Sequence, residues 1–237
     1  MVISFRFRLV PSIVAVLVIA LGIVLAQWQT HRGDEKAVLQ TRLDARGMEP
    51  VLHLGETIVD PNAIEFRRVQ LKGSFLREWP VYLDNRPYNG IAGFYLLMPF
   101  KITASNLHVL IARGWFPRDP ADRTRMPHIP VPSGEVVIEG IARRDIGHVM
   151  QLGMLDTPQP GAIVQNLDIA EFAVSSDLKM QPVLIEQSSA SDDGLIRDWP
   201  HPATGVERHR AYAFQWYALS LMAFIFFVVT GFRRGEK

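Results

Sequence analysis

The sequence predicts a membrane protein in which two transmembrane α-helices flank a mostly-β extramembrane domain, an antiparallel sandwich or barrel with few short helices. Two long uncharged segments, Leu9 to Ala26 and Ala211 to Phe232, predict the helices. Because a helix rises about 1.5 Å per residue, segments of this length can cross a hydrocarbon core of about 30 Å. Between them, short runs of β-branched and aromatic residues are separated by turn-forming residues, which is typical of strands.

The chain of 237 residues divides into six parts in this interpretation. They are a cytoplasmic N-terminus (1–8), the first span (9–28), a helical extension (29–47), a periplasmic mostly-β domain (48–208), the second span (209–232) and a cytoplasmic C-terminus (233–237). In the extension, charged residues surround a sparse apolar stripe, and Gly47 is expected to cap its C-terminus. The alternative for the first span is a signal peptide cleaved after Ala26, which the length of the apolar segment disfavours.

Basic residues beside the spans predict their orientation. Arg6 and Arg8 precede the first span, while Arg233, Arg234 and Lys237 follow the second. The positive-inside rule therefore places both ends of the chain in the cytoplasm and exports the segment between the spans. Since two crossings return the chain to its starting side, the exported ends of both spans should lie at the same, outer face of the membrane.

Seven short runs within the exported segment predict strands. They cover residues 66–71, 80–83, 91–99, 107–112, 136–142, 163–165 and 183–186. A short helix is expected at 168–174, where Asp168 and Glu171 fit a capping box. The stretches 116–134 and 145–162 are rich in Pro, Gly, Asp and Arg, which predicts long surface loops.

The composition and the motifs argue against several classes of function. With 25 basic and 24 acidic residues the net charge is +1, which gives no support to nucleic-acid binding. The chain has no cysteine, so disulfides, CxxC redox chemistry and thiolate metal sites are excluded. No nucleophile elbow, P-loop, HExxH or dinucleotide fingerprint occurs in the sequence, and we predict that the protein is not an enzyme.

Some polar residues have both a structural and a functional interpretation. Arg113 in "VLIARGWFPRD" and Arg86 in "LDNRPYNG" are expected to be paired surface residues, although a guanidinium can also hold a carboxylate such as a porphyrin propionate. The pair Asp192-Asp193 predicts a solvated turn. His148, with the thioethers of Met150 and Met154, offers the alternative of a soft copper site.

The ends of the two spans carry nearly the same polar and aromatic set. We call the segments 26–32 ("AQWQTHR") and 207–217 ("ERHRAYAFQWY") the two rims; each holds a Gln-Trp pair, a His and an Arg. At 100° per residue, one face of the second span contains His209, Tyr212, Ala213, Trp216, Ser220 and Ala223. Interface anchoring explains the aromatic residues. It does not explain Gln215, because an amide in an apolar segment usually finds a partner, and Gln27 is the predicted partner across the helices.

Several pieces of the sequence resemble the surfeit locus protein 1 family, assembly factors for haem-copper terminal oxidases. In family order they are "QWQTHRGDEKAVLQTRL", "FRRVQLKGSF", "LDNRPYNGIAGFYLLMPF", "VLIARGWFPRD", "PVPSGEVVIEGIAR" and "GLIRDWPHPATGVERHRAYAFQWYALSL". They cover most of the chain from Gln27 to Leu221. The last piece together with the RGW strand is the most specific part of the resemblance.

The resemblance implies a non-enzymatic assembly factor for cytochrome c oxidase that assists the delivery or insertion of haem a into the catalytic subunit. It implies haem a as cofactor and oxidase subunit I, haem a synthase and membrane lipid as partners. Some family members are thought to bind haem a through a His near the start of the second span, a position that His209 occupies here as expected axial iron ligand. Our own inference adds Trp28, Tyr212 and Trp216 as porphyrin walls and Arg32, Arg208 or Arg210 as partners of the propionates.

Two alternatives and a location complete these expectations. The protein could hold oxidase subunit I without binding haem itself, or it could be a membrane-anchored enzyme if the fold brings carboxylates and a His together in a deep pocket. The N-terminus lacks a Ser- and Arg-rich transit peptide, which favours a multi-pass protein of the bacterial inner membrane with a periplasmic domain over one of the mitochondrial inner membrane.

Overall fold

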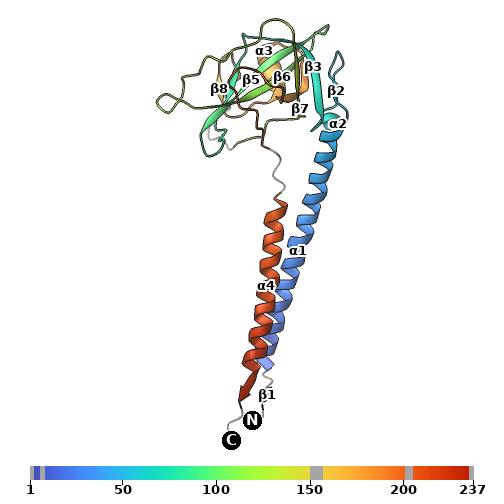
Figure 1. Cartoon of the computed structure of the whole chain (residues 1–237), viewed down its shortest axis with the longest axis vertical. Coiled ribbons are helices and arrows are strands. Elements are labelled where there is room, and N and C mark those ends of the chain that lie inside the picture. Colours follow the sequence, from blue (N-terminus) through green and yellow to red (C-terminus); the bar gives the residue numbers. More distant parts are fainter. Residues whose placement is uncertain (1–2, 6–8, 150–156, 201–204, 235–237) are drawn as a thin grey trace. The chain divides into compact units, whose positions relative to one another are not determined.

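The structure is a computed structural model of the chain and describes residues 3–5, 9–149, 157–200 and 205–234. The chain forms two compact units (Figure 1). One contains Met1–Leu43 and Pro202–Lys237, and the other contains Asp44–His201. The sequence-based fold class is confirmed, because two long apolar helices flank a mostly-β domain.

Two helices dominate the first unit, α1 (Leu9–Met48) and α4 (Val206–Gly231). Both are long and apolar enough to cross a membrane, by length and composition. The structure has one continuous helix through the range of the expected extension. The expected cap at Gly47 is wrong: this glycine lies inside the last turn and lacks the positive φ of a terminating glycine.

The facing residues of α1 and α4 recur at alternating spacings of three and four. On α1 the buried and half-buried positions include Ser12, Ala15, Ile19, Gly22, Ala26, Gln29 and Gly33. On α4 they include Val206, His209, Ala213, Trp216, Ser220, Ala223 and Phe227. This spacing is the seam of a left-handed helix pair, and its small residues allow the backbones to approach closely. We call these two rows of residues the seam.

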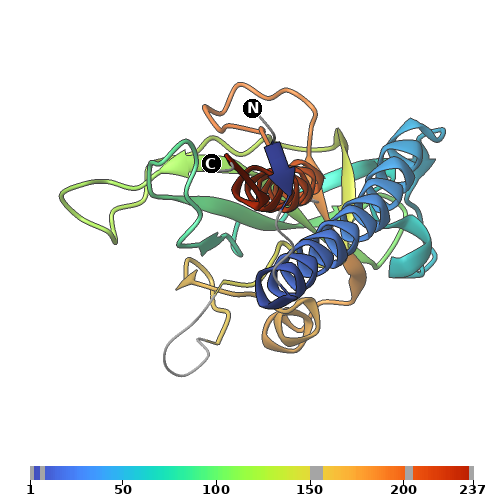
Figure 2. The same ribbon diagram turned by 90° about the horizontal axis from the view of Figure 1, so that it is seen from below.

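The terminal segments pair at one end of the helix pair. β1 (Ile3–Phe5) and β10 (Phe232–Arg234) form a two-stranded antiparallel ribbon, with Ile3 opposite Arg234. Figure 2 views the helices from this end. Both termini of the first unit therefore lie at the same end, as two successive crossings of one membrane require.

The second unit is built on a closed five-stranded barrel. Its strands are β3 (Arg68–Phe75), β5 (Gly93–Ile102), β6 (His108–Pro117), β7 (Val136–Arg143) and β9 (Met180–Gln187). Their order is β3-β7-β9-β6-β5, and a pairing of β3 with β5 closes the ring. The β6–β9 pair is parallel and the other barrel pairs are antiparallel. The expectation of an antiparallel barrel therefore holds for four of the five strand pairs.

Short elements extend the barrel. They are β2 (Leu52–His53), α2 (Pro61–Ile64), β4 (Val81–Leu83), β8 (Ile163–Val164) and α3 (Ile169–Ser176). Each of the seven predicted strands has a counterpart, whereas β2 and α2 were not predicted. Asp168 caps α3 as expected, because its Oδ1 accepts hydrogen bonds from the backbone amides of Ala170 and Glu171 at 2.7 and 3.0 Å.

Two apolar cores follow from the alternation of side chains along the barrel strands. The inner core takes residues from all five barrel strands, such as Val69, Ile111 and Ile185. The outer core covers β4, β5, β6 and β9 on the other face and includes Phe172 of α3. Gly73 permits the closing pair, since a Cβ there would lie 1.9 Å from the Lys101 carbonyl oxygen.

Candidate functional site

The helix pair brings the two rims together through one polar contact. His209 Nδ1 on α4 and Gln29 Oε1 on α1 lie 2.7 Å apart, a hydrogen bond between residues 180 positions apart in the chain. Both side chains are half-buried in the seam. The helices are close beside this pair, since a Cβ added to Gly33 of α1 would lie in ordinary contact with the Cβ of His209, at 3.5 Å. The His expected to matter is thus held at the rim by the other helix.

The structure separates the residues expected around His209 into two groups. Trp216 shares the seam with His209 and is half-buried, whereas Tyr212 and Trp28 are 46% and 56% exposed on the flanks of their helices. Arg208 and Arg210 are exposed beside His209, and Arg210 lies 3.7 Å from Glu207. His31 is exposed as well and lies 3.5 Å from Glu35.

The expected hydrogen bond between Gln27 and Gln215 does not form. Both side chains point outward from their helices and are exposed. The physical reason is register: the seam passes through Gln29 on α1 and through Ala213 and Trp216 on α4, one or two residues away from the predicted pair. The expected pair is therefore wrong, and the amide that bonds across the helices is that of Gln29, with His209.

An apolar groove runs along the seam below the rim. It has a volume of about 430 Å³ and is lined by residues of both helices, among them Val18, Gly22, Trp216 and Phe226. Its volume lies within the range of about 300–1,000 Å³ that is usual for small-molecule sites. Trp216 forms part of its wall, about 10 Å along the helix axis from His209 by the rise of an α-helix.

His209 is suited to be the axial ligand of a haem iron, and haem is the cofactor that the resemblance implies. A haem ligand needs a ring nitrogen with a free lone pair at the edge of an apolar region. Gln29 engages only Nδ1, and among the contacts between described residues Nε2 has no partner. The adjacent aromatic side chains and the exposed Arg208 and Arg210 suit a flat apolar ring that carries carboxylates.

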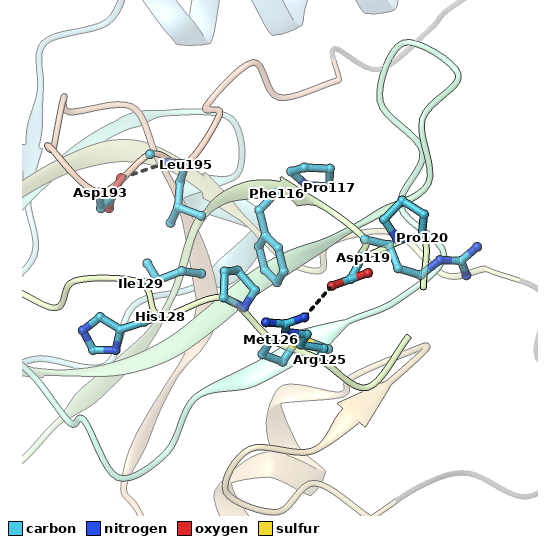
Figure 3. Close-up of a pocket in the computed structure, with 13 residues that line it drawn as sticks. Phe116, Pro117, Asp119, Pro120, Arg125, Met126, His128, Ile129, Asp193 and Leu195 are labelled. Atoms are coloured by element: carbon cyan, nitrogen blue, oxygen red, sulfur yellow. Dashed lines mark hydrogen bonds and ion pairs between the residues drawn. The ribbon is translucent and has the colours of Figure 1, made fainter. Parts of the chain in front are cut away.

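One depression in the β-domain has a volume of about 720 Å³ (Figure 3). Phe116 and Pro117 at the end of β6 line it, together with the loops 118–129 and 193–195. Asp119, His128 and Asp193 all contribute to this lining, which is the combination that the enzyme alternative requires. In Figure 3 the His128 ring and the two carboxylates point in different directions. The carboxylates are bound to arginines and backbone amides instead, and Asp119 lies 3.8 Å from Arg125.

Asp193 corrects the expectation of a solvated turn. It is buried, and its Oδ2 accepts hydrogen bonds from Arg113 at 2.7 Å and from Arg197 at 2.6 Å. Burial lowers the pKa of Arg113, and the Asp193 carboxylate opposes this effect. The turn folds inward because β6 places the Arg113 guanidinium inside the barrel, where an unpaired charge would be very costly.

Arg113 and Arg86 are structural residues, and both are buried rather than at the surface. Arg113 is 1% exposed and also donates to the carbonyl oxygen of Pro130 at 2.8 Å. Arg86 donates to the carbonyl oxygens of Gly147 and Gln165 at 3.1 and 3.0 Å, and burial lowers its pKa. Because both guanidinium groups are buried and bonded within the domain, neither is accessible to a propionate.

Glu186 on β9 is a buried carboxylate that the sequence did not single out. Burial raises its pKa to about 7, although Arg143 at 3.4 Å acts in the opposite direction. Glu186 is the one charged residue of its strand, so the sequence signal was a single acid near the end of "PVLIEQ". A carboxylate that titrates near neutrality makes the domain sensitive to pH.

The described residues contain no group of three or more His, Asp or Glu side chains that could hold a metal ion. His148 lines a separate depression of about 400 Å³ near Asp168 and Met180. The other ligands of the copper alternative, Met150 and Met154, lie outside the described residues.

Comparison with known proteins identifies the family. The sequence model of the SURF1 family matches residues 16–221, which is most of the chain. The chain belongs to the SURF1 family. The resemblance noted from the sequence pieces is therefore confirmed.

Eukaryotic relatives of the SURF1 family agree with this assignment. A SURF1-like protein of Dictyostelium discoideum is 31% identical over 47% of this chain and 43% of its own length. Surfeit locus protein 1 of Arabidopsis thaliana is 34% identical over 40% of the chain and 30% of its own length. The matches to these two relatives thus span less than half of their length. A SURF1-like protein of Monosiga brevicollis is 23% identical over 95% of the chain and 88% of its own length.

The SURF1 match includes both rims and the seam residues Gln29 and His209. Sequence reasoning found His209 but missed Gln29. The signal was present in the small residues Gly22, Ala26 and Gly33, because a seam drawn through them at spacings of four, three and four passes through position 29.

Proposed function

We propose that this member of the SURF1 family is an assembly factor for haem-copper cytochrome c oxidase that assists the delivery or insertion of haem a into the catalytic subunit. The family match over residues 16–221 supports the assembly role. The observation that supports the haem step is the half-buried His209 at the rim, with one ring nitrogen bound to Gln29 and the other without a partner among the described residues.

The residues of the helix pair have distinct roles in this proposal. When bound, haem a supplies a redox-active iron in a flat apolar ring. His209 would hold the iron, while Trp216, Tyr212 and Trp28 offer aromatic surface to the ring. The exposed Arg208 and Arg210 offer guanidinium groups to the propionates. The groove along the seam offers further apolar surface below the rim.

The proposed partners are oxidase subunit I, haem a synthase and membrane lipid. The proposed location is the bacterial inner membrane, with two crossings and a periplasmic β-domain, and the mitochondrial inner membrane is the alternative. The two apolar helices support attachment to a membrane. A second function, supported by the exposed apolar faces of both helices, is an interaction protein that holds subunit I without binding haem itself.

The test is the haem content of the protein purified from cells that synthesise haem a, measured by its visible spectrum and as pyridine haemochrome. His209→Ala is compared with His31→Ala, a matched control because His31 lies on the rim of α1 but is exposed and outside the seam. We expect the wild type and His31→Ala to retain haem a and His209→Ala to lose most of it.

Each other outcome has a defined meaning. Full haem content in His209→Ala would overturn the ligand assignment. Absence of haem from all three proteins, when the wild type restores oxidase assembly in cells that lack it, would favour the interaction protein. Failure of the wild type to restore assembly would contradict the assembly role itself.

A further inference from the structure

The contact between Gln29 and His209 is the side-chain hydrogen bond that joins the two rims in the described part of the helix pair. Its two members are 180 residues apart in the chain, yet their polar atoms lie 2.7 Å apart. Gln29 occupies a seam position, four residues before Gly33 and three after Ala26, and both of these small residues are buried. The seam therefore aims the amide of Gln29 at the partner helix.

Several features hold this contact in place. The helices are close beside His209, because a Cβ added to Gly33 would be in ordinary contact with the His209 Cβ, at 3.5 Å. A turn further on, the buried Ala26 and Ala213 keep the backbones close. An amide at the edge of an apolar segment is costly without a partner, so the hydrogen bond is favoured where water is scarce.

The chemistry of the amide decides which ring nitrogen of His209 has the proton. A carboxamide oxygen has lone pairs and no hydrogen, so it can only accept. The oxygen of Gln29 faces Nδ1, and Nδ1–H must therefore be the donor. In a neutral imidazole with a proton on Nδ1, the lone pair is on Nε2.

We propose that Gln29 is a positioning residue for His209: it fixes the Nδ1–H tautomer and presents the lone pair of Nε2 to a haem iron. The inference rests on the proposed function for the identity of the ligand and deepens it, because it names the ligating nitrogen and the residue that prepares it. Hydrogen bonds of this kind to the second nitrogen of a ligating His orient the ring and raise its basicity.

The arrangement also makes the site depend on the pairing of the helices. His209 belongs to α4 and its orienting partner to α1, so neither helix alone presents the prepared imidazole. A ligand that binds Nε2 should in turn favour the paired state of α1 and α4, because it binds only one tautomer.

The first test reads the tautomer directly and needs no haem. The full-length protein, with 15N-labelled histidine, is reconstituted in nanodiscs in mildly alkaline buffer, in which imidazole is neutral, and the ring nitrogens are observed by NMR. The His209 signals are assigned by their loss in His209→Ala. We expect a protonated Nδ1 and an unprotonated Nε2 in the wild type.

Variants at position 29 separate positioning from a merely structural role. Gln29→Glu keeps an acceptor oxygen and should preserve the Nδ1–H tautomer, whereas Gln29→Leu removes it and should shift His209 towards a proton on Nε2. Gln27→Leu is the matched control, because Gln27 lies on the same rim but is exposed. It should leave the tautomer unchanged.

Titration with haem then measures how the tautomer of His209 affects haem affinity. Removal of such a partner typically weakens metal binding about 10- to 100-fold, so we expect a loss of this size in Gln29→Leu and near-normal affinity in Gln29→Glu and Gln27→Leu. A wild-type His209 protonated on Nε2, or a tautomer that Gln29→Leu leaves unchanged, would overturn the inference even if haem binds. If His209 has the expected proton on Nδ1 but the protein never binds haem, the proposed function is contradicted. The role of Gln29 in fixing the tautomer of His209 would still be supported.

Discussion

Glu186 shows how burial sets the properties of a single side chain in this domain. Its carboxylate is almost fully inaccessible, and Arg143 at 3.4 Å compensates only part of the cost of removing the charge from water. Asp193 lies in a comparable environment but has two guanidinium partners at 2.7 and 2.6 Å. The number and distance of the cationic partners thus distinguish a carboxylate that is fully paired from one whose pKa is raised to about 7.

The raised pKa of Glu186 predicts a pH dependence of stability. The folded state retains the proton up to about pH 7, whereas the unfolded chain releases it near its ordinary value of 4.5. Between these values the folded state binds more protons, so the free energy of unfolding falls as the pH rises. The penalty is absent below about 4.5, and above about 7 it reaches about 3 kcal/mol.

The variant Glu186→Gln should lack this penalty. We expect it to match the wild type at pH 4.5 and to exceed its free energy of unfolding at pH 8 by up to about 3 kcal/mol, measured by urea unfolding of the full chain in detergent and followed by near-ultraviolet circular dichroism. Glu78→Gln, at an exposed position, controls for the loss of a negative charge. An advantage of Glu186→Gln that is the same at both pH values would show that Glu186 does not titrate in this range.

At the scale of elements, the seam between α1 and α4 combines small residues with hydrogen bonds between the helices. Besides the Gln29–His209 pair, the Ser220 hydroxyl lies 3.5 Å from the carbonyl oxygen of Ile19. The helices are close at Gly22 opposite Ser220, where a Cβ added to the glycine would overlap the Ser220 Oγ and lie 3.4 Å from the Ser220 Cβ. The Ser220 hydroxyl donates to the Trp216 carbonyl oxygen of its own helix at 2.9 Å. This arrangement specifies the register of the two helices.

The register can be tested by a disulfide, because the chain has no cysteine. Disulfides need Cβ atoms about 3.5–4.5 Å apart, close to the distance between positions 22 and 220. We expect Gly22→Cys/Ser220→Cys to form an intramolecular disulfide when membranes are treated with an oxidant, detected by mass spectrometry of the joined peptides. Ala20→Cys/Ser220→Cys should not react, since Ala20 is exposed on the outer side of α1. Equal yields from both pairs would show that this register is wrong.

The strands of the barrel were predictable individually, but their closure was not. Runs such as "GFYLLMPFKI" and "VVIEGIAR" have the composition of strands, and they form β5 and β7. The β3–β5 pairing depends on Gly73, whose lack of a side chain lets two backbones meet. In the sequence this glycine is indistinguishable from a turn residue. The inward turn at Asp193 was missed for a related reason, because its partner Arg113 is 80 residues away.

For the whole molecule, the sequence predicted the order of its parts and the His at the rim, whereas pairings between distant residues required the structure. The spans follow from a local property, the length of an uncharged segment. Gln29 and His209 meet only because the two helices pack in one register, which no local pattern specifies. Local patterns therefore predict elements, and the site depends on their packing.

The topology of the whole chain gives the last prediction. The basic ends predict that both termini are cytoplasmic and that the β-domain is exported. In the cysteine-free chain, Ile91→Cys, which replaces an exposed side chain of the β-domain, should react with a membrane-impermeant maleimide in intact spheroplasts. Ser4→Cys and Arg234→Cys, in the paired terminal segments, should react only after permeabilisation. The reverse pattern would invert the orientation, and labelling of only one terminus from outside would show that the chain does not cross twice. Either result would mean that the two rims do not both lie at the outer face of the membrane, where the proposed haem site requires them.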